Sequence, residues 1–135
     1  FGWPYCYGNQ QTDPVLSSAN SNYCAGTTNP TLQLPAHMAP LGATFATSPQ
    51  LPAGQWGGLL VALHGSQHAS YYSGYKIMRV AMQGTQPVGV SDFATGWLSN
   101  GSYWGRPVDI VQGPDGAFYV SDDLAGAVYR IWYGG

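Results

Sequence analysis

The chain of 135 residues has the length of one domain, and only 7% of its residues are charged, against about 25% in average globular proteins. Its net charge of −2 excludes the basic surface that binding to a nucleic-acid backbone requires. No apolar run approaches the roughly 18 residues of a transmembrane helix, so no membrane span is expected.

The first 36 residues are predicted to form a loop region, because Pro4, Pro14 and two later prolines interrupt any regular pattern. Cys6 and Cys24 enclose a polar, turn-rich stretch, and a disulfide between them would stabilise it by about 3 kcal/mol in the loop-entropy model. Two buried free thiols are the alternative, while a metal site is less expected because no second Cys or His lies at ligand spacing. A disulfide implies an oxidising compartment, so we expect the periplasm or the outside of the cell.

From Ala39 onward, short apolar runs alternate with turn residues, which predicts β-strands. A first set of strands is expected at residues 41–46, 58–63, 75–82 and 90–94, and a second set at 108–112, 117–121 and 127–132. Within the second set, the Asp115-Gly116 pair is a strong hairpin signal. No segment shows sustained helical periodicity, so the predicted fold class is all-β.

The two sets of strands resemble each other in sequence. APLGATFA…GGLLVALHG…SGYKIMRV aligns with RPVDIVQG…GAFYVSDDL…AGAVYRIW, and a repeated unit of three or four antiparallel strands is typical of a propeller blade. We therefore expect about two blades of a β-propeller with four-stranded antiparallel sheets, at residues 37–103 and 104–135, behind the loop region. A coincidental likeness between two β-meanders is the alternative.

The second blade is expected to have three strands where the first has four. Propellers commonly complete a last blade with a strand from the far end of the chain, so we expect these residues to be part of a longer protein. Two blades cannot close a ring, and their flanks are apolar faces that need cover. The expected partners are the remaining blades or other copies of the chain, for example three copies in one ring.

Four stretches in this order carry a family resemblance: FGWPYCYG, LPAHMAPLGATF, LLVALHGS…GYKIMRV and WGRPVDIVQGPDGAFYVSDDLAGAVYRI. Together they resemble the C-terminal third of soluble pyrroloquinoline-quinone (PQQ)-dependent sugar dehydrogenases, in particular the sorbosone-dehydrogenase-like branch. The resemblance implies a six-bladed propeller, secreted or periplasmic, that oxidises sugars or other polyols. It also implies PQQ over the central channel, with calcium beside it.

The resemblance assigns three residues of this chain to the cofactor. His37 matches a position that faces the cofactor at the start of a blade's innermost strand, and His64 matches a cationic or polar ligand at the end of a second strand. Arg106 matches an arginine that pairs with a quinone carboxylate, with Asp109 near enough to orient it; a bidentate arginine suits one of the three carboxylates. The alternatives are local roles: a turn cap for His37, a hydrogen-bonded, partly buried His64, and an Arg106–Asp109 salt bridge.

The chain also departs from the family pattern. Relatives usually follow His-Gly-Ser with Trp-Asn-Arg, where this chain has Gln67-His68-Ala69, so one cation beside a tri-anionic cofactor is lost. The catalytic base histidine and the calcium ligands lie in earlier blades of the family, so we expect no catalytic residue and no metal site in this segment. Asp122 and Asp123 are interpreted as turn residues that accept hydrogen bonds from local backbone.

The leading functional prediction is the C-terminal part of a PQQ-dependent sugar dehydrogenase, in which His37, His64 and Arg106 hold the cofactor for a sugar or polyol substrate. The alternative is a non-catalytic extracellular module, structural or binding, that assembles with other chains as an oligomer or filament. Aromatic stretches such as SYYSGYK favour this alternative. Two weaker hypotheses are a hydrolase using Ser66 and His68 and a metal site built from His37, His64 and His68.

Overall fold

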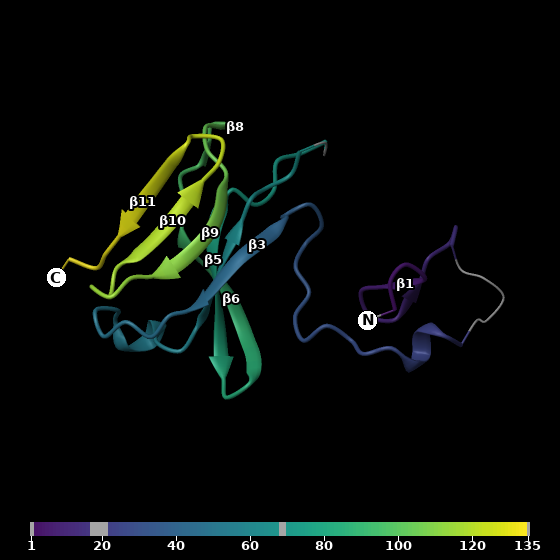
Figure 1. Ribbon diagram of the computed structural model, residues 1–135. Helices are drawn as coiled ribbons and strands as arrows, with labels where there is room; N and C mark the ends of the chain where they lie inside the picture. Colours follow the sequence, from purple (N-terminus) through teal and green to yellow (C-terminus); the bar gives the residue numbers. More distant parts are fainter. Residues whose placement is uncertain (1, 17–21, 68–69, 135) are drawn as a thin grey trace. The chain divides into compact units, whose positions relative to one another are not determined.

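The computed structural model describes residues 2–16, 22–67 and 70–134 and divides the chain into two compact units, Phe1–Leu34 and Pro35–Gly135 (Figure 1). The strands are β1 (Cys6–Tyr7), β2 (Gln11–Thr12), β3 (Pro40–Phe45), β4 (Leu59–Leu63), β5 (Lys76–Gln83), β6 (Gln86–Ala94), β7 (Leu98–Ser99), β8 (Ser102–Tyr103), β9 (Pro107–Gln112), β10 (Phe118–Asp122) and β11 (Ala127–Ile131). Two short 3-10 turns, η1 (Cys24–Gly26) and η2 (Ala53–Gln55), are the helical elements of the described residues. None of the described helices is long and apolar enough to cross a membrane.

The N-terminal unit is held together by a disulfide between Cys6 and Cys24, whose Cα atoms lie 5.6 Å apart. Strands β1 and β2 pair antiparallel beside it. The side chain of Gln10 donates hydrogen bonds to the carbonyls of Ala25 and Thr27 at 3.0 and 2.7 Å, which joins the η1 turn to the β1–β2 hairpin. The predicted disulfide is confirmed, and the alternative of two free thiols is wrong.

The second unit contains two antiparallel sheets, each built in chain order. The first has the order β3-β4-β5-β6 and the second has β9-β10-β11, with β11 at its outer edge. Between the two sheets in the sequence, β7 and β8, of two residues each, form a separate antiparallel hairpin. The predicted all-β fold, with a four-stranded and a three-stranded antiparallel sheet behind a disulfide-closed region, is confirmed.

The predicted strand limits agree with the structure to within one residue, except at the start of β6. That strand begins at Gln86 rather than at residue 90. Pro87 and Gly89 look like turn residues, but β6 is an edge strand, where a proline removes no ladder hydrogen bond. The hairpins β1–β2 and β7–β8 were not predicted, because two-residue strands are too short to show alternation.

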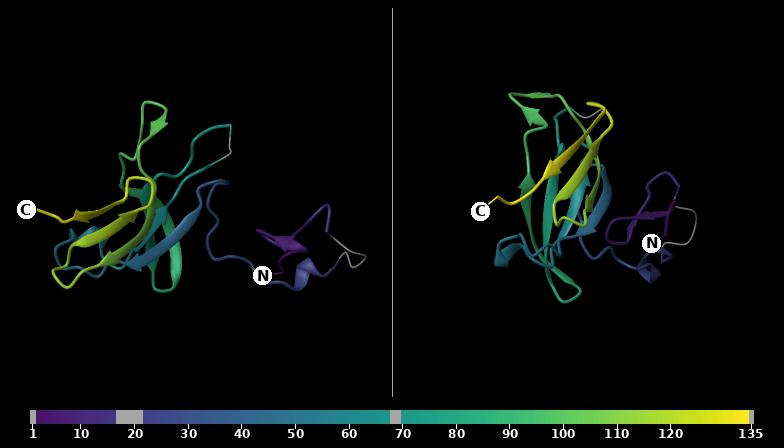
Figure 2. Two further views of the ribbon diagram at one scale, coloured as in Figure 1. Left: turned by 45° about the horizontal axis from the view of Figure 1, so that its top comes forward. Right: turned by 60° about the vertical axis from the view of Figure 1, so that its left-hand side comes forward.

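The core of the second unit lies between its two sheets. Strand β9 packs against β3 and β4, and both views in Figure 2 show β9 beside these strands. The core cluster takes alternate residues of the strands, which are Leu60, Ala62, Ile77, Ile110, Phe118 and Val120. Strand β4 is buried on both faces, since Leu60 to Leu63 are all buried. The connections add Ala46, Leu51, Tyr75 and Trp97 to this cluster. Two of the connections are therefore anchored by large aromatic rings.

Strand register brings several chain segments to one end of the two sheets. In the first sheet, Pro40 at the start of β3 pairs with Leu63 at the end of β4. In the second sheet, Pro107 at the start of β9 pairs with Asp122 at the end of β10. The residues just outside these ends include every lining residue of the pocket described next.

Candidate functional site

A solvent-open pocket of about 380 Å³ lies at this end of the sheets. Its lining residues are His37, Ala39, His64, Gly65, Ser66, Gln67 and Arg106. The structure thus brings together the three residues that the family resemblance had selected, although they come from three separate segments of the chain. A ligand role for them stays a prediction at this point.

The backbone around the pocket adopts conformations that non-glycine residues rarely take. His37 and Ala39 have φ angles of 67° and 48°, in the left-handed region. The carbonyls of Met38 and Ala39 accept hydrogen bonds from the amides of Gly65 and His64, each at 3.0 Å. The 37–39 turn is therefore tied to the end of β4, and strained positions of this kind cluster at functional sites.

The guanidinium of Arg106 is fixed by main-chain oxygens of the first sheet. Its Nε donates to the carbonyl of His64 at 3.2 Å and its Nη2 donates to the carbonyl of Gly65 at 2.6 Å. These bonds occupy one edge of the planar group and leave the edge formed by Nη1 and Nη2 for another acceptor. No ion pair in the described part of the chain includes Arg106.

The expectation that Asp109 orients Arg106 is wrong, and so is the alternative of a salt bridge between them. The Asp109 carboxylate accepts a hydrogen bond from the Ile110 amide at 2.8 Å, and it packs against Gly42 of β3, where no Cβ would fit. It lines a different pocket, on the face of the second sheet.

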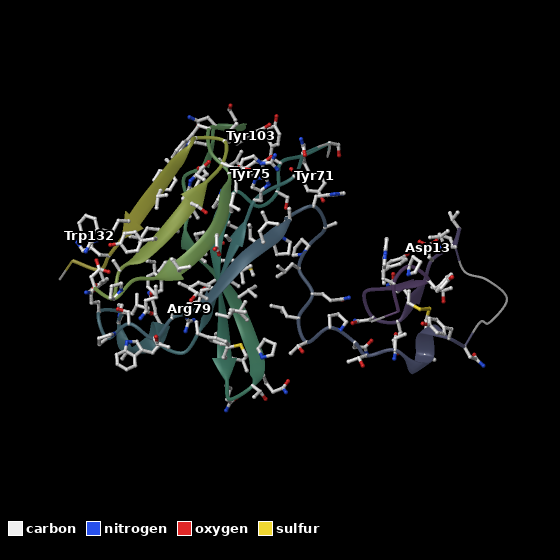
Figure 3. All side chains as sticks on the ribbon, in the orientation of Figure 1. Asp13, Tyr71, Tyr75, Arg79, Tyr103 and Trp132 are labelled. Carbon is white, nitrogen blue, oxygen red and sulfur yellow. A yellow bond between two sulfur atoms is a disulfide. The ribbon has the colours of Figure 1, made fainter. Side chains whose placement is uncertain are left out.

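Two tyrosine rings lie beneath the Arg106 guanidinium. Its central carbon is 5.7 Å from the ring centroid of Tyr75 and 5.9 Å from that of Tyr103, within the range of cation–π attraction. The two rings stack on each other with centroids 4.7 Å apart, and Figure 3 shows both at the same end of the sheets. Sequence reasoning missed this support, because no local pattern links residues 75, 103 and 106.

Tyr75 also supports the main chain that lines the pocket. Its side chain is buried, its φ is 57°, and its hydroxyl donates to the carbonyl of Ser66. Gly65, with φ at 95°, lies so close that a Cβ there would come within 2.6 Å of the Tyr75 ring. The main chain that holds Arg106 is therefore itself set by Tyr75.

His64 is bound by an acidic residue of the other sheet. Its Nε2 lies 2.9 and 3.1 Å from the two carboxylate oxygens of Asp123, in the turn between β10 and β11. The hydrogen bond with His64 is the main cause that lowers the pKa of Asp123 below its ordinary value. The interpretation of Asp122 and Asp123 as acceptors for local backbone holds for Asp122 toward the Ala125 amide. It missed the bond that Asp122 accepts from the Arg106 amide, 16 residues away, and the contact of Asp123 with His64.

His37 is exposed on the pocket wall, and its ring meets the edge of Tyr71 with centroids 6.5 Å apart. Ser66 does not offer a free nucleophile: its hydroxyl donates to the Tyr71 carbonyl at 3.2 Å and accepts from the Ser73 amide at 3.1 Å. His68 lies outside the described residues. The hydrolase hypothesis and the three-histidine metal site both depend on His68, so they fall outside the described residues too. In the described ranges, no group of three or more His, Cys, Asp or Glu could hold a metal ion.

A second pocket, of about 220 Å³, lies at the opposite strand ends beside Phe118 and Ile131. Trp132 and Tyr133 form part of its wall, and the rest is mostly apolar or amide side chains. It contains no Asp, Lys, Arg or His. The charged pocket at Arg106 is therefore the better candidate for chemistry on a polar ligand.

Comparison with known proteins places this geometry in context. The profile of the family described as TrAA12-like matches residues 1–133. A protein of Borreliella burgdorferi described as uncharacterized is 34% identical over 139 residues, which cover 98% of this chain and 36% of that protein. The holo form of the pyranose dehydrogenase PQQ domain from Coprinopsis cinerea is 32% identical, with a TM-score of 0.59, over 80% of this chain and 30% of that one.

An iodide structure of a Trichoderma reesei carbohydrate-active enzyme of family AA12 is similar in fold, with a TM-score of 0.71 at 20% identity. It is matched over 91% of this chain and 32% of its own. The chain thus spans about a third of the length of these relatives. The likeness in fold agrees with the prediction of two propeller blades.

Proposed function

The chain belongs to the TrAA12-like family, and from this premise we propose that it supplies a cofactor-holding pocket to a PQQ-dependent sugar dehydrogenase. The similarity to a PQQ domain at 32% identity supports the cofactor. The observation that carries the proposal is the pocket lined by Arg106, His37 and His64, in which the hydrogen bonds of the Arg106 guanidinium to described residues come from Nε and Nη2.

The donor set fits a ligand with several carboxylates, as PQQ has. Arg106 is the one permanent cation among the lining residues, and its free Nη1–Nη2 edge has the geometry that binds a carboxylate through two hydrogen bonds. His64 adds imidazole donors when protonated. Relatives usually have Trp-Asn-Arg where this chain has Gln67-His68-Ala69. Since this arginine is missing here, the affinity of the pocket for an anion depends more strongly on Arg106.

The proposal assigns binding and orientation to this chain rather than proton transfer. Arg106 holds one carboxylate, while His64 and His37 contact the same ligand from the end of β4 and the start of β3. The quinone, when bound, supplies the two-electron oxidation of a sugar or polyol hydroxyl. No catalytic base and no calcium ligand is assigned to these residues.

The proposed setting is a longer propeller, since the chain spans about a third of its relatives. In this setting residues 37–103 and 104–135 are neighbouring blades near the C-terminal end, other blades cover their exposed faces, and the chemistry is that of the sorbosone-like branch. The disulfide between Cys6 and Cys24 supports the periplasm or the outside of the cell.

The test is a titration of the intact protein that carries this chain with PQQ, in which calorimetry measures the affinity. Replacing Arg106 by Ala removes a charge-assisted contact and is expected to weaken PQQ binding by about 10- to 100-fold. Arg130→Ala is the matched control, because Arg130 also lies over an aromatic ring, 4.9 Å from that of Trp132, and pairs with Asp115 away from the pocket. An unchanged affinity in Arg106→Ala contradicts the proposal.

A further inference from the structure

The contact between His64 and Asp123 joins the two sheets of the second unit. His64 follows β4 of the first sheet, and Asp123 follows β10 of the second. One ring nitrogen, Nε2, meets both carboxylate oxygens at 2.9 and 3.1 Å. A carboxylate accepts hydrogen bonds and does not donate them, so this contact places a proton on Nε2 and leaves Nδ1 as the ring nitrogen for another partner.

The turn that carries Asp123 is held in place by its neighbour. The carboxylate of Asp122 accepts hydrogen bonds from the Ala125 amide at 2.8 Å, from the Arg106 amide at 2.9 Å and from the Tyr129 hydroxyl at 3.1 Å. Asp122 is buried, so these bonds fix the direction in which the turn presents Asp123.

The main chain of His64 is fixed as well. Its amide donates to the Ala39 carbonyl at 3.0 Å, and its carbonyl accepts from Nε of Arg106 at 3.2 Å. Its side chain is 18% exposed, whereas that of Asp123 is 60% exposed. The imidazole is therefore a partly buried ring whose orientation depends on one contact from the opposite sheet.

We propose that Asp123 is a positioning residue: it binds Nε2 of His64, sets the tautomer of the ring, and leaves Nδ1 as the atom that meets a ligand in the pocket. The inference rests on the proposed function for the identity of that ligand, a carboxylate of PQQ. In the imidazolium form, one N–H then donates to Asp123 and the other to the ligand. The negative charge of Asp123 is balanced within the pair, so it does not repel an anion beside Arg106.

A structural ion pair at the surface contributes little to stability, so stability alone cannot reveal this role. The deciding measurement is the ¹⁵N NMR spectrum of the histidine rings. The chain contains three histidines, and a His64→Gln variant assigns the signals of His64. In the unaltered protein, the neutral form of the His64 ring is expected to show the shift of a protonated nitrogen at Nε2 and that of an unprotonated one at Nδ1.

Asp123→Asn is expected to remove this pattern, because the amide can donate to Nε2 and so favour the other tautomer. Asp123→Glu should restore the pattern, since it returns a carboxylate. Asp115→Asn, the same change in the other turn of the sheet, should leave the His64 signals unaltered. If the His64 nitrogens of Asp123→Asn keep the shifts of the unaltered protein, the inference is wrong.

The same variants separate this inference from the proposed function. Calorimetry with PQQ should give about three- to tenfold weaker binding for Asp123→Asn, roughly the effect of one hydrogen bond, with recovery in Asp123→Glu. Failure of the unaltered protein to bind PQQ overturns the proposed function, while the NMR spectra still decide whether Asp123 sets the His64 tautomer. PQQ binding that is equal in Asp123→Asn and the unaltered protein overturns the ligand role of His64 Nδ1 alone.

Discussion

Arg106 and Tyr75 form a contact across the two sheets, with the guanidinium carbon 5.7 Å from the ring centroid. Tyr75 is buried, and its hydroxyl binds the carbonyl of Ser66, next to the two carbonyls that hold Arg106. The position of the Arg106 guanidinium thus depends on the Tyr75 ring, which is not among the residues that line the pocket.

The first prediction concerns the Tyr75 hydroxyl. Tyr75→Phe keeps the ring under Arg106 but leaves the Ser66 carbonyl without its donor, which should lower the free energy of unfolding by about 1 kcal/mol. Tyr75→Ala removes the ring and should cost about 3–5 kcal/mol. Urea denaturation measures both. Tyr72→Phe, on a half-exposed ring, is the control, and equal stability of Tyr75→Phe and the unaltered protein would contradict the reading of this contact.

A second prediction concerns Gly65. Its φ of 95° is unfavourable for alanine, and the added Cβ would approach the Tyr75 ring to 2.6 Å. Gly65→Ala should therefore lower stability by about 1–3 kcal/mol and weaken anion binding, because the Gly65 carbonyl must move away from Arg106. Thermal unfolding and PQQ titration measure the two effects. Gly89→Ala, at a site with open space and ordinary backbone, should show neither.

A third prediction concerns acid stability. The hydrogen bond from Arg130 is the main cause that lowers the pKa of Asp115 below its ordinary value of 3.8. Since the folded pKa is below the unfolded one, the carboxylate stabilises the fold at pH above about 3.8, and this contribution is lost as the pH falls through the lowered value. Asp115→Asn should therefore reduce the slope of stability against pH below 4, measured by denaturation at fixed pH. An unchanged slope would argue against the Asp115–Arg130 contact as its source.

A fourth prediction concerns the disulfide. Reducing Cys6–Cys24, which encloses a sequence separation of 18 residues, should destabilise the N-terminal unit by about 3 kcal/mol on the loop-entropy model. Hydrogen exchange followed by mass spectrometry should show faster exchange in residues 2–16 and 22–34. Strands β4 and β5 are the internal reference. Unchanged exchange in the N-terminal unit after complete reduction would contradict the prediction.

Local sequence patterns predicted the strands of the two sheets, because alternation and turn residues such as Asp115-Gly116 act over a few positions. The Cys6–Cys24 disulfide followed from the composition of the enclosed loop. The gathering of His37, His64 and Arg106 was suggested by the family resemblance, and the register of β3, β4 and β9 explains it: each residue lies just outside a strand end on the same side.

The partners of these residues could not be predicted in the same way. Asp123 meets His64 across a separation of 59 residues, and the stack of Tyr75 on Tyr103 depends on how two sheets pack. Asp109 is near Arg106 in sequence, yet strand geometry directs it toward Gly42. Contacts between distant segments follow from tertiary packing, which no local pattern contains.

The hold of main-chain carbonyls on Arg106 has a mechanical consequence. The arginine precedes β9 of one sheet, while the oxygens that bind it follow β4 of the other. An anion that binds Arg106 and His64 together would therefore link the two sheets where they meet. If the anion binds only while the two sheets are packed together, it adds RT ln(1 + [L]/Kd) to the free energy needed to separate them. The ligand would therefore stabilise the contact between the sheets that forms its own pocket.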